Sequence, residues 1–179
     1  MLGTELLNQY AAGKRDFTSV DLSEVELAGA NLKGVILDEA SLDGANLNGV
    51  DLSQASLQNA DLNGANLTNA NLTGANLTGA ILEGAILEGA ILDSANLSQS
   101  ELTIAKVIEA DLSQADLSEA NLSAANLDKA NLSGVNARSS DLSSANLTGA
   151  NLDEANLNGA NLEGANLKGT ILDENTEID

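Results

Sequence analysis

Cysteine, histidine, proline and tryptophan are absent from this 179-residue chain, which has only one tyrosine and one phenylalanine. The lack of thiols and imidazoles excludes cysteine nucleophiles, histidine acid–base relays, disulfides and typical zinc sites. Two aromatic rings cannot supply a stacking surface for single-stranded nucleic acid. No apolar run approaches the roughly 18 residues that a transmembrane helix requires. We therefore expect no catalytic centre, no metal or cofactor, and no membrane partner.

Positive charge is also scarce, because seven lysines and arginines oppose 27 aspartates and glutamates, which gives a formal net charge of −20. This sign opposes contact with phosphate backbones, so we expect no direct nucleic-acid binding. With 43% hydrophobic residues the chain can still form a folded core. The first residues, Met1-Leu-Gly-Thr-Glu-Leu-Leu, lack the basic segment and apolar core of a secretory signal, and we expect a cytoplasmic protein.

An internal repeat of five residues organises nearly the whole chain. Every fifth position from Phe17 to Leu172 is a core candidate, and 29 of these 32 centres are leucine. Alanine stands two positions before 23 of the 32 centres, and valine before five. The position between them is asparagine in 15 repeats and aspartate in seven.

A period of five fits neither a helix nor a straight strand. On a helix each repeat advances about 500°, so the leucines would form no stripe. On a straight strand an odd period would send alternate leucines to opposite faces. The chain must therefore turn once in every repeat. This predicts alanine and leucine pointing inward, and asparagine pointing outward to bond local backbone or its neighbours.

Glycine marks the corners of these turns. Fourteen of the 16 glycines occupy the second corner position, where a type II turn requires a positive φ. Asn59 and Asn69 occupy the same position and tolerate it. For corners that end in glutamate, glutamine, serine or lysine we expect another turn type.

The unbroken Ala-(Asn/Asp)-Leu-x-x motif, clearest in Ala65-Asn-Leu-Thr-Asn-Ala-Asn-Leu-Thr-Gly, resembles the pentapeptide repeat proteins, which are common in bacteria and abundant in photosynthetic ones. The resemblance implies an all-β fold, a right-handed, four-sided parallel β-helix with four repeats per coil. The 32 repeats would then form about eight coils. At the usual strand spacing the rod would be about 38 Å long.

Residues 1–14 are predicted to cap the N-terminal end of this β-helix, since open strand edges invite aggregation. A short helix over residues 4–12 would begin at Thr4 as its N-cap and end before Gly13. The side chains expected to cover the first coil beside Phe17 are Leu6, Leu7 and Tyr10.

The remaining boundaries place the β-helix at 15–174 and a C-terminal tail at 175–179. Residues 98–109 follow the repeat least regularly and suggest a junction between two shorter ancestral rods. No second capping helix is predicted, so the last coil could associate with another copy, as a homodimer or end to end.

Acidic residues concentrate on two opposite sides of the predicted rod, because residues 20 apart share a side. Seven acids on one side alternate between the positions before and after the central leucine, and we call them the acidic strip: Asp21, Asp43, Asp61, Glu83, Glu101, Asp141 and Glu163. One interpretation is that this staggering keeps like charges from stacking directly. The other is a phosphate-like strip that a protein partner recognises.

The charge density favours a comparison with DNA. The repeats hold 24 acids and six bases, a net charge of −18. This corresponds to one charge per about 2 Å of rod, against about 1.7 Å in duplex DNA. Some pentapeptide repeat proteins imitate duplex DNA and bind gyrase, so the resemblance implies a DNA-mimicking inhibitor or protector of gyrase as an alternative function. Those relatives typically dimerise through a C-terminal helix, for which this chain has no candidate.

A second surface feature is apolar. Five isoleucines at outward or corner positions of two successive coils form a predicted isoleucine belt: Ile81, Ile86, Ile91, Ile104 and Ile108. The belt is either a partner-binding surface or a consequence of the β-propensity of isoleucine. Together these features predict a non-enzymatic interaction protein, an acidic rod whose protein partner the sequence does not identify.

Overall fold

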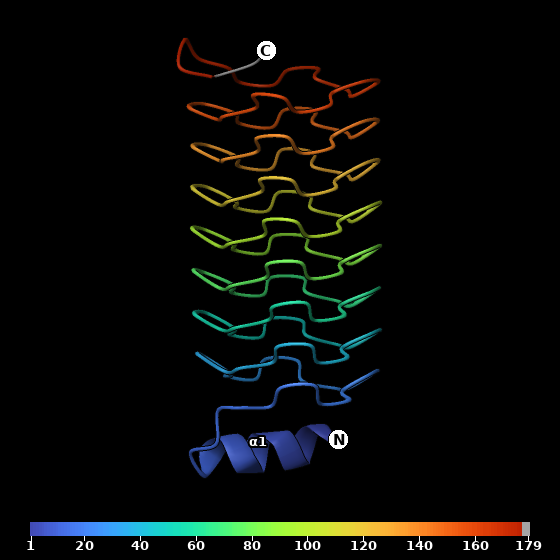
Figure 1. Cartoon of the computed structure of the whole chain (residues 1–179), viewed down its shortest axis with the longest axis vertical. Coiled ribbons are helices and arrows are strands. Elements are labelled where there is room, and N and C mark those ends of the chain that lie inside the picture. The colour runs from blue at the N-terminus through green and yellow to red at the C-terminus, as the bar shows by residue number, and fades with distance from the viewer. Residues whose placement is uncertain (177–179) are drawn as a thin grey trace.

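The computed structural model describes residues 1–176 as a straight rod of stacked coils, with one helix lying across its N-terminal end (Figure 1). Helix α1 spans Gly3–Ala11. From Asp16 to Ile171 the chain forms isolated parallel bridges, each joining residues 20 apart, as Asn66 joins Ile86. One coil therefore contains four pentapeptides. No helix among the described residues is long and apolar enough to cross a membrane.

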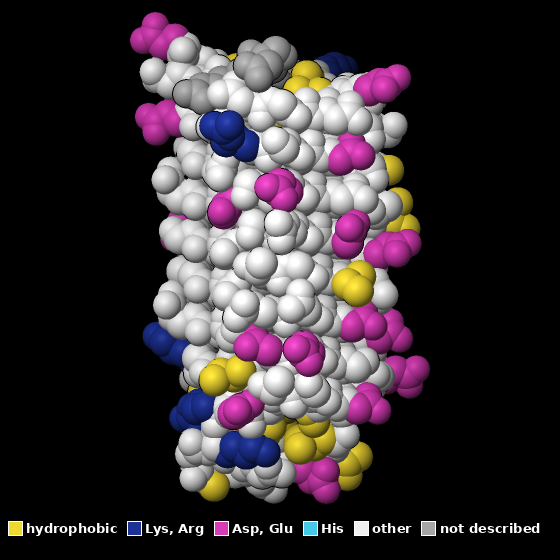
Figure 2. Space-filling model, viewed as in Figure 1, with side chains coloured by type: hydrophobic (Ala, Val, Ile, Leu, Met, Phe, Trp, Pro, Cys, Tyr) yellow, Lys and Arg dark blue, Asp and Glu magenta, His cyan; other side chains and the backbone are white. Residues whose placement is uncertain are grey.

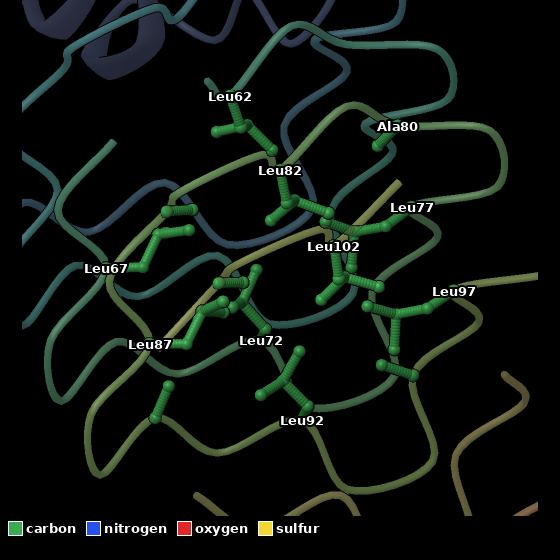
Figure 3. Packing of buried hydrophobic residues seen from close by; sticks show 14 of the residues in the cluster. Leu62, Leu67, Leu72, Leu77, Ala80, Leu82, Leu87, Leu92, Leu97 and Leu102 are labelled. Carbon is green, nitrogen blue, oxygen red and sulfur yellow. The ribbon is translucent and has the colours of Figure 1, made fainter. Parts of the chain in front are cut away.

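The interior of the rod consists of leucine and alanine side chains stacked from coil to coil (Figure 3). On one side, Leu62, Leu82 and Leu102 occupy successive coils and are at most 1% exposed. The intervening alanines, such as Ala80, are equally buried. The predicted inward direction of alanine and leucine is thus confirmed.

Hydrogen bonds satisfy every backbone N–H of a regular repeat, as the pentapeptide 66–70 shows. Asn66 donates to the coil below, at Ala45 O (2.9 Å), and Leu67 donates to the coil above, at Ile86 O (2.7 Å). The corner residue Asn69 also donates to the coil above, and Ala70 N closes the turn onto Leu67 O. The last N–H, that of Thr68, donates to the side chain of Asn66 (3.1 Å). Proline would remove one of these donors, which explains its absence.

The corners from residue 19 to residue 169 share one backbone conformation. The 14 corner glycines have φ between 59° and 71°, and the non-glycine residues at the same position have φ between 54° and 60°. The expectation of a different turn type at glutamate, glutamine, serine and lysine corners is therefore wrong. Up to residue 149 each corner N–H donates to a carbonyl of the next coil, as Glu39 N does to Gln58 O (2.8 Å), and the stack imposes this geometry on every residue type.

Helix α1 begins earlier than predicted, at Gly3 with Leu2 as its N-cap, so the assignment of Thr4 as N-cap is wrong. The Glu5 carboxylate accepts the Leu2 N–H (3.1 Å) in place of a threonine hydroxyl. A Cβ on Gly3 would lie 2.8 Å from Glu26 O, so only glycine lets the helix start this close to the first coil. The helix ends at Ala11, one residue before the predicted end, and Gly13 lies just past the last turn as expected, with φ 98° and its N–H donating to Tyr10 O (3.0 Å).

The helix closes the rod through the predicted side chains. Leu6 is fully buried, and Leu7 and Tyr10 pack against the same core as Phe17. The Tyr10 hydroxyl donates to Lys33 O (2.8 Å). Both aromatic rings thus belong to the N-terminal cap. At the other end, the predicted tail at 175–179 extends beyond the described residues.

Candidate interaction surface

The outward asparagines and aspartates hold the corners of the rod. In each of the 22 repeats that carry one, its Oδ1 accepts the N–H of the residue two positions later, at 2.9–3.4 Å. Several of the side-chain amides also donate to the coil below, as Asn146 does to Asn126 (2.9 Å). The predicted bonding to backbone and neighbours is confirmed. We call the side chain-to-backbone contact the corner bond.

The seven residues of the acidic strip lie on one side of the rod, in three structural settings. Asp21, Asp61 and Asp141 make corner bonds of 2.9–3.1 Å. Glu101 accepts the side-chain amide of Asn121 (2.9 Å). The remaining three stand at the first corner position and are exposed: Asp43, Glu83 and Glu163. The aspartates that precede the central leucine therefore stabilise corners as well as carrying charge.

Hydrogen bonds also keep strip carboxylates ionised. The Ser23 N–H and then its hydroxyl lower the pKa of Asp21 below its usual range. The Ser143 N–H and hydroxyl lower the pKa of Asp141 in the same way. A carboxylate that accepts such bonds favours its charged form. Asp21 and Asp141 therefore stay charged to a lower pH than an ordinary aspartate does.

Few cations offset this charge. Among residues 1–176 the ion pairs are those of Lys129 with Glu109 (3.4 Å) and with Asp128 (4.0 Å). An exposed pair of this kind contributes at most about 1 kcal/mol. Acidic side chains recur at successive levels along the right edge of the rod in Figure 2. The surface thus presents many carboxylates with few neighbouring cations.

The isoleucine belt interrupts this acidic surface. Ile81, Ile91 and Ile104 are 38%, 44% and 55% exposed, and Ile86 and Ile108 are half-buried. Bridges place Ile81 directly between Asp61 and Glu101, and Ile86 between Asn66 and Lys106. The side chain of Ile104 extends over Gly84: a Cβ added at Gly84 would lie 3.9 Å from Cδ1 of Ile104. The structure therefore brings Ile81, Ile86 and Ile104 around one corner of the rod, with Ile108 at the next corner and Ile91 beyond it.

The comparisons with known proteins identify the family. A model of pentapeptide repeats (8 copies) matches residues 16–54, 46–84, 70–106, 105–143 and 138–173. The chain belongs to the pentapeptide repeat family. Members fold as right-handed quadrilateral β-helices and are generally structural or interaction modules. None of the curated protein sequences compared with this pentapeptide repeat protein matched it.

Two solved structures of pentapeptide repeat proteins resemble the chain over most of its length. HetL from the cyanobacterium Nostoc, a protein involved in heterocyst differentiation regulation, is 34% identical, with 96% of this chain and 94% of HetL covered and a TM-score of 0.65. QnrB1, a plasmid-mediated fluoroquinolone resistance protein, is 23% identical, with 89% and 82% covered and a TM-score of 0.67. The second likeness supports the fold alone.

Within the regular pentapeptide repeat, the belt is a place where corner bonds fail in succession. Isoleucine has no acceptor, so the N–H groups of Glu83, Glu88 and Asp93 lack the bond that Asn66 gives to Thr68. Glutamate and lysine stand in place of asparagine in two further repeats, at positions 101 and 106. Five of the six corners between residues 81 and 108 therefore have no corner bond within the described chain; only Asn96 makes one. The sequence contained this signal as the loss of asparagine at these positions.

Ile104 adds backbone strain at the same place. Among the 17 non-glycine residues with positive φ in the described chain it is the only β-branched one, with φ 54°. A β-branched side chain in this region is a genuine outlier, and such strain costs about 1–3 kcal/mol. The next coil carries Ala124 at the equivalent corner. The belt thus combines exposed apolar area, lost hydrogen bonds and strain.

No three acidic residues among residues 1–176 are grouped to hold a metal ion. An open cavity of about 360 Å³ lies between the start of α1 and the first coil, lined by residues 1–4 and 23–26. Its polar side chains are Thr4, Ser23, Glu24 and Glu26, and the Ser23 hydroxyl donates to Asp21 Oδ1 (2.9 Å).

We expect Asp141→Asn to preserve stability at neutral pH, because an asparagine oxygen makes the same corner bond. Asp141→Ala should lose about 0.5–1.5 kcal/mol of the free energy of unfolding. The carboxylate has a lowered pKa in the folded state, so its contribution is present above about pH 4 and lost as the pH falls through the folded value. Urea midpoints at pH 7 and at about pH 2–3 should therefore show wild type losing stability relative to Asp141→Asn. Equal pH profiles would contradict the role of the charge.

Proposed function

We propose that this pentapeptide repeat protein is a non-enzymatic interaction module. It is an acidic rod of about eight coils that binds the basic surface of a protein partner. The observation that carries this proposal is the acidic strip, in which seven carboxylates follow the axis of the rod. The ion pairs of the described surface join Lys129 to Glu109 and Asp128, which lie outside the strip. Electrostatic complementarity of this kind gives fast association and partner selection.

The structure suggests a test that removes charge without disturbing the fold. In the strip variant every acid is replaced by its amide, so aspartate corners keep their acceptor: Asp21→Asn, Asp43→Asn, Asp61→Asn, Glu83→Gln, Glu101→Gln, Asp141→Asn and Glu163→Gln. The control variant loses seven charges from the opposite side: Asp51→Asn, Asp93→Asn, Asp111→Asn, Asp153→Asn, Glu154→Gln, Asp173→Asn and Glu174→Gln. Both variants carry the same net charge.

Binding to a defined basic probe, polylysine, is measured by calorimetry at about 50 and about 300 mM salt. We expect wild type to bind more weakly at high salt, and the strip variant to bind at least about tenfold more weakly than the control variant. Equal affinities of the two variants would show that net charge alone matters and would remove the strip as a site. No binding of wild type at low salt would contradict the acidic-rod proposal itself.

A second candidate function is DNA mimicry toward gyrase or another topoisomerase. The spacing of one charge per about 2 Å of rod, close to that of duplex DNA, favours it. Such a protein should inhibit DNA supercoiling or protect the enzyme, and its effect should fall as salt rises. A supercoiling assay with wild type and the strip variant tests this. Absence of any effect at low salt would exclude the candidate.

We also propose that the β-helix spans residues 15–174 and that a junction between two shorter ancestral rods lies near residues 98–109. The bridges continue through this segment, as Ile81 pairs with Glu101 and Ile86 with Lys106.

At the C-terminal end of the described chain, three apolar side chains are 38–53% exposed: Leu167, Ile171 and Leu172. Association of this coil with a second copy is a prediction that sedimentation at rising concentration would test.

A further inference from the structure

We propose that the isoleucine belt is a docking surface for an extended segment of a partner protein that combines apolar side chains with lysine or arginine. This inference deepens the proposed function and rests on it, since it assigns a place on the acidic rod and a chemistry to the partner. The centre of the surface is the corner formed by Ile81, Ile86 and Ile104.

The belt residues destabilise the rod, whereas the residues of its core stabilise it. Ile81, Ile86 and Ile91 stand where asparagine would make the corner bond. Ile104 stands where glycine would relieve the strain of its positive φ. Three of the five side chains are exposed to solvent. A surface with lost hydrogen bonds, strain and exposed apolar area matches the properties of a binding site better than those of a packing solution.

Charge around the belt specifies the partner. Ile81 lies between Asp61 and Glu101 on neighbouring coils, and Glu83 follows it at the exposed corner. Beyond Ile86 the exposed acids are Glu88 and Glu109, with Lys106 as the adjacent base. An apolar centre with an acidic rim complements apolar side chains flanked by cations. A second copy of this chain would bring the same acidic rim against itself, and an anionic membrane would be repelled.

The shape of the belt favours an extended segment. Ile81, Ile86 and Ile91 lie in three successive repeats of one coil and so face three successive sides of the quadrilateral rod. A rigid helix contacts one side and the adjoining corner, whereas an extended chain can follow the coil around its corners. In such a chain alternate side chains point the same way, so apolar residues can face the belt while lysines reach the rim.

The experiment uses two fluorescein-labelled peptides of equal length and charge. In the apolar peptide lysine alternates with valine, and in the polar peptide lysine alternates with serine. Anisotropy titrations compare wild type with a belt variant, Ile81→Asn/Ile86→Asn/Ile104→Gly, and with Ile36→Asn, a matched control. Ile36 occupies the same outward position outside the belt, where its bridges join Asp16 and Ser56.

We expect wild type to bind the apolar peptide about tenfold more tightly than the polar one. The belt variant should lose this preference, and Ile36→Asn should keep it. The belt variant regains corner acceptors and loses the strained residue, so its Tm should equal that of wild type or exceed it by about 2–4 °C. Loss of preference with a preserved Tm therefore reports binding rather than unfolding.

Equal affinity of wild type for the two peptides, or an unchanged preference in the belt variant, overturns the belt as a docking surface. In that outcome, salt-dependent binding of the polar peptide would still support the acidic rod as an interaction module. If neither peptide binds at low salt, the proposed function fails and this inference fails with it. Concentration-dependent sedimentation that the belt variant abolishes would instead assign the surface to a second copy.

Discussion

Leu87→Ala is expected to lower the free energy of unfolding by about 3–5 kcal/mol. Leu87 is fully buried in the middle of the rod, where its side chain stacks between those of neighbouring coils (Figure 3). The backbone around it is fixed by bonds to the coils on both sides, such as Leu87 N to Lys106 O (2.7 Å). The rod therefore cannot collapse into the cavity, and the loss should lie at the upper end of the range for leucine truncation.

The matched control is Leu167→Ala, on the same side of the rod four coils later. Leu167 is 38% exposed, so its truncation removes less buried area and leaves no closed cavity. We expect a loss of about 1 kcal/mol there. Urea unfolding followed by circular dichroism would measure both variants, with the m-value checked for each. Equal losses at the two positions would contradict the description of Leu87 as a rigidly enclosed core residue.

The coil geometry was predictable because three consecutive residues of each repeat indicate which side chains point inward and which points outward. Alternation within Ala65-Asn66-Leu67 sets two side chains inward and one outward, and the next two residues must form a corner. The same reasoning predicted that an outward asparagine bonds local backbone or its neighbours, and the structure shows that the backbone partner is the N–H two residues later. These relations are local, so one sequence suffices to read them.

The uniform corner conformation was not predictable from local preference. Glutamate, lysine and isoleucine all avoid positive φ in isolation, yet Glu39, Lys129 and Ile104 adopt it here. Bonds from each corner N–H to the next coil decide the conformation, and they depend on the stack rather than on the residue. The N-cap was missed for a similar reason, because the close approach of Gly3 to Glu26 is a tertiary contact.

The location of the acidic strip and the isoleucine belt on the rod was predictable from the sequence. The hydrogen bonds of their side chains were not. Residue spacing placed the acidic strip and the belt on the correct sides, because a 20-residue coil converts sequence separation directly into location. The sequence did not reveal that hydrogen bonds from serine hold the pKa of Asp21 and Asp141 below the usual range.

Leu6→Asp is expected to detach helix α1 and destabilise the N-terminal coil by about 3–5 kcal/mol. Leu6 is fully buried between the helix and the first coil, and a carboxylate there would have no partner. In a stacked rod each coil contacts only its neighbours, so the damage should stay local. Hydrogen exchange should show lost protection at Phe17 N and Leu22 N, which donate to the second coil, and little change at Leu132 N.

The control is Leu2→Asp, the same substitution at a residue that is 67% exposed at the start of the helix. It should leave exchange unchanged, because an exposed acid near a helix N-terminus is favourable. With the cap detached, the bare edge of the first coil in Leu6→Asp is open to pairing with other chains, so light scattering should rise with concentration for this variant alone. A uniform fall in protection along the whole rod would show that α1 stabilises all coils cooperatively rather than closing one end.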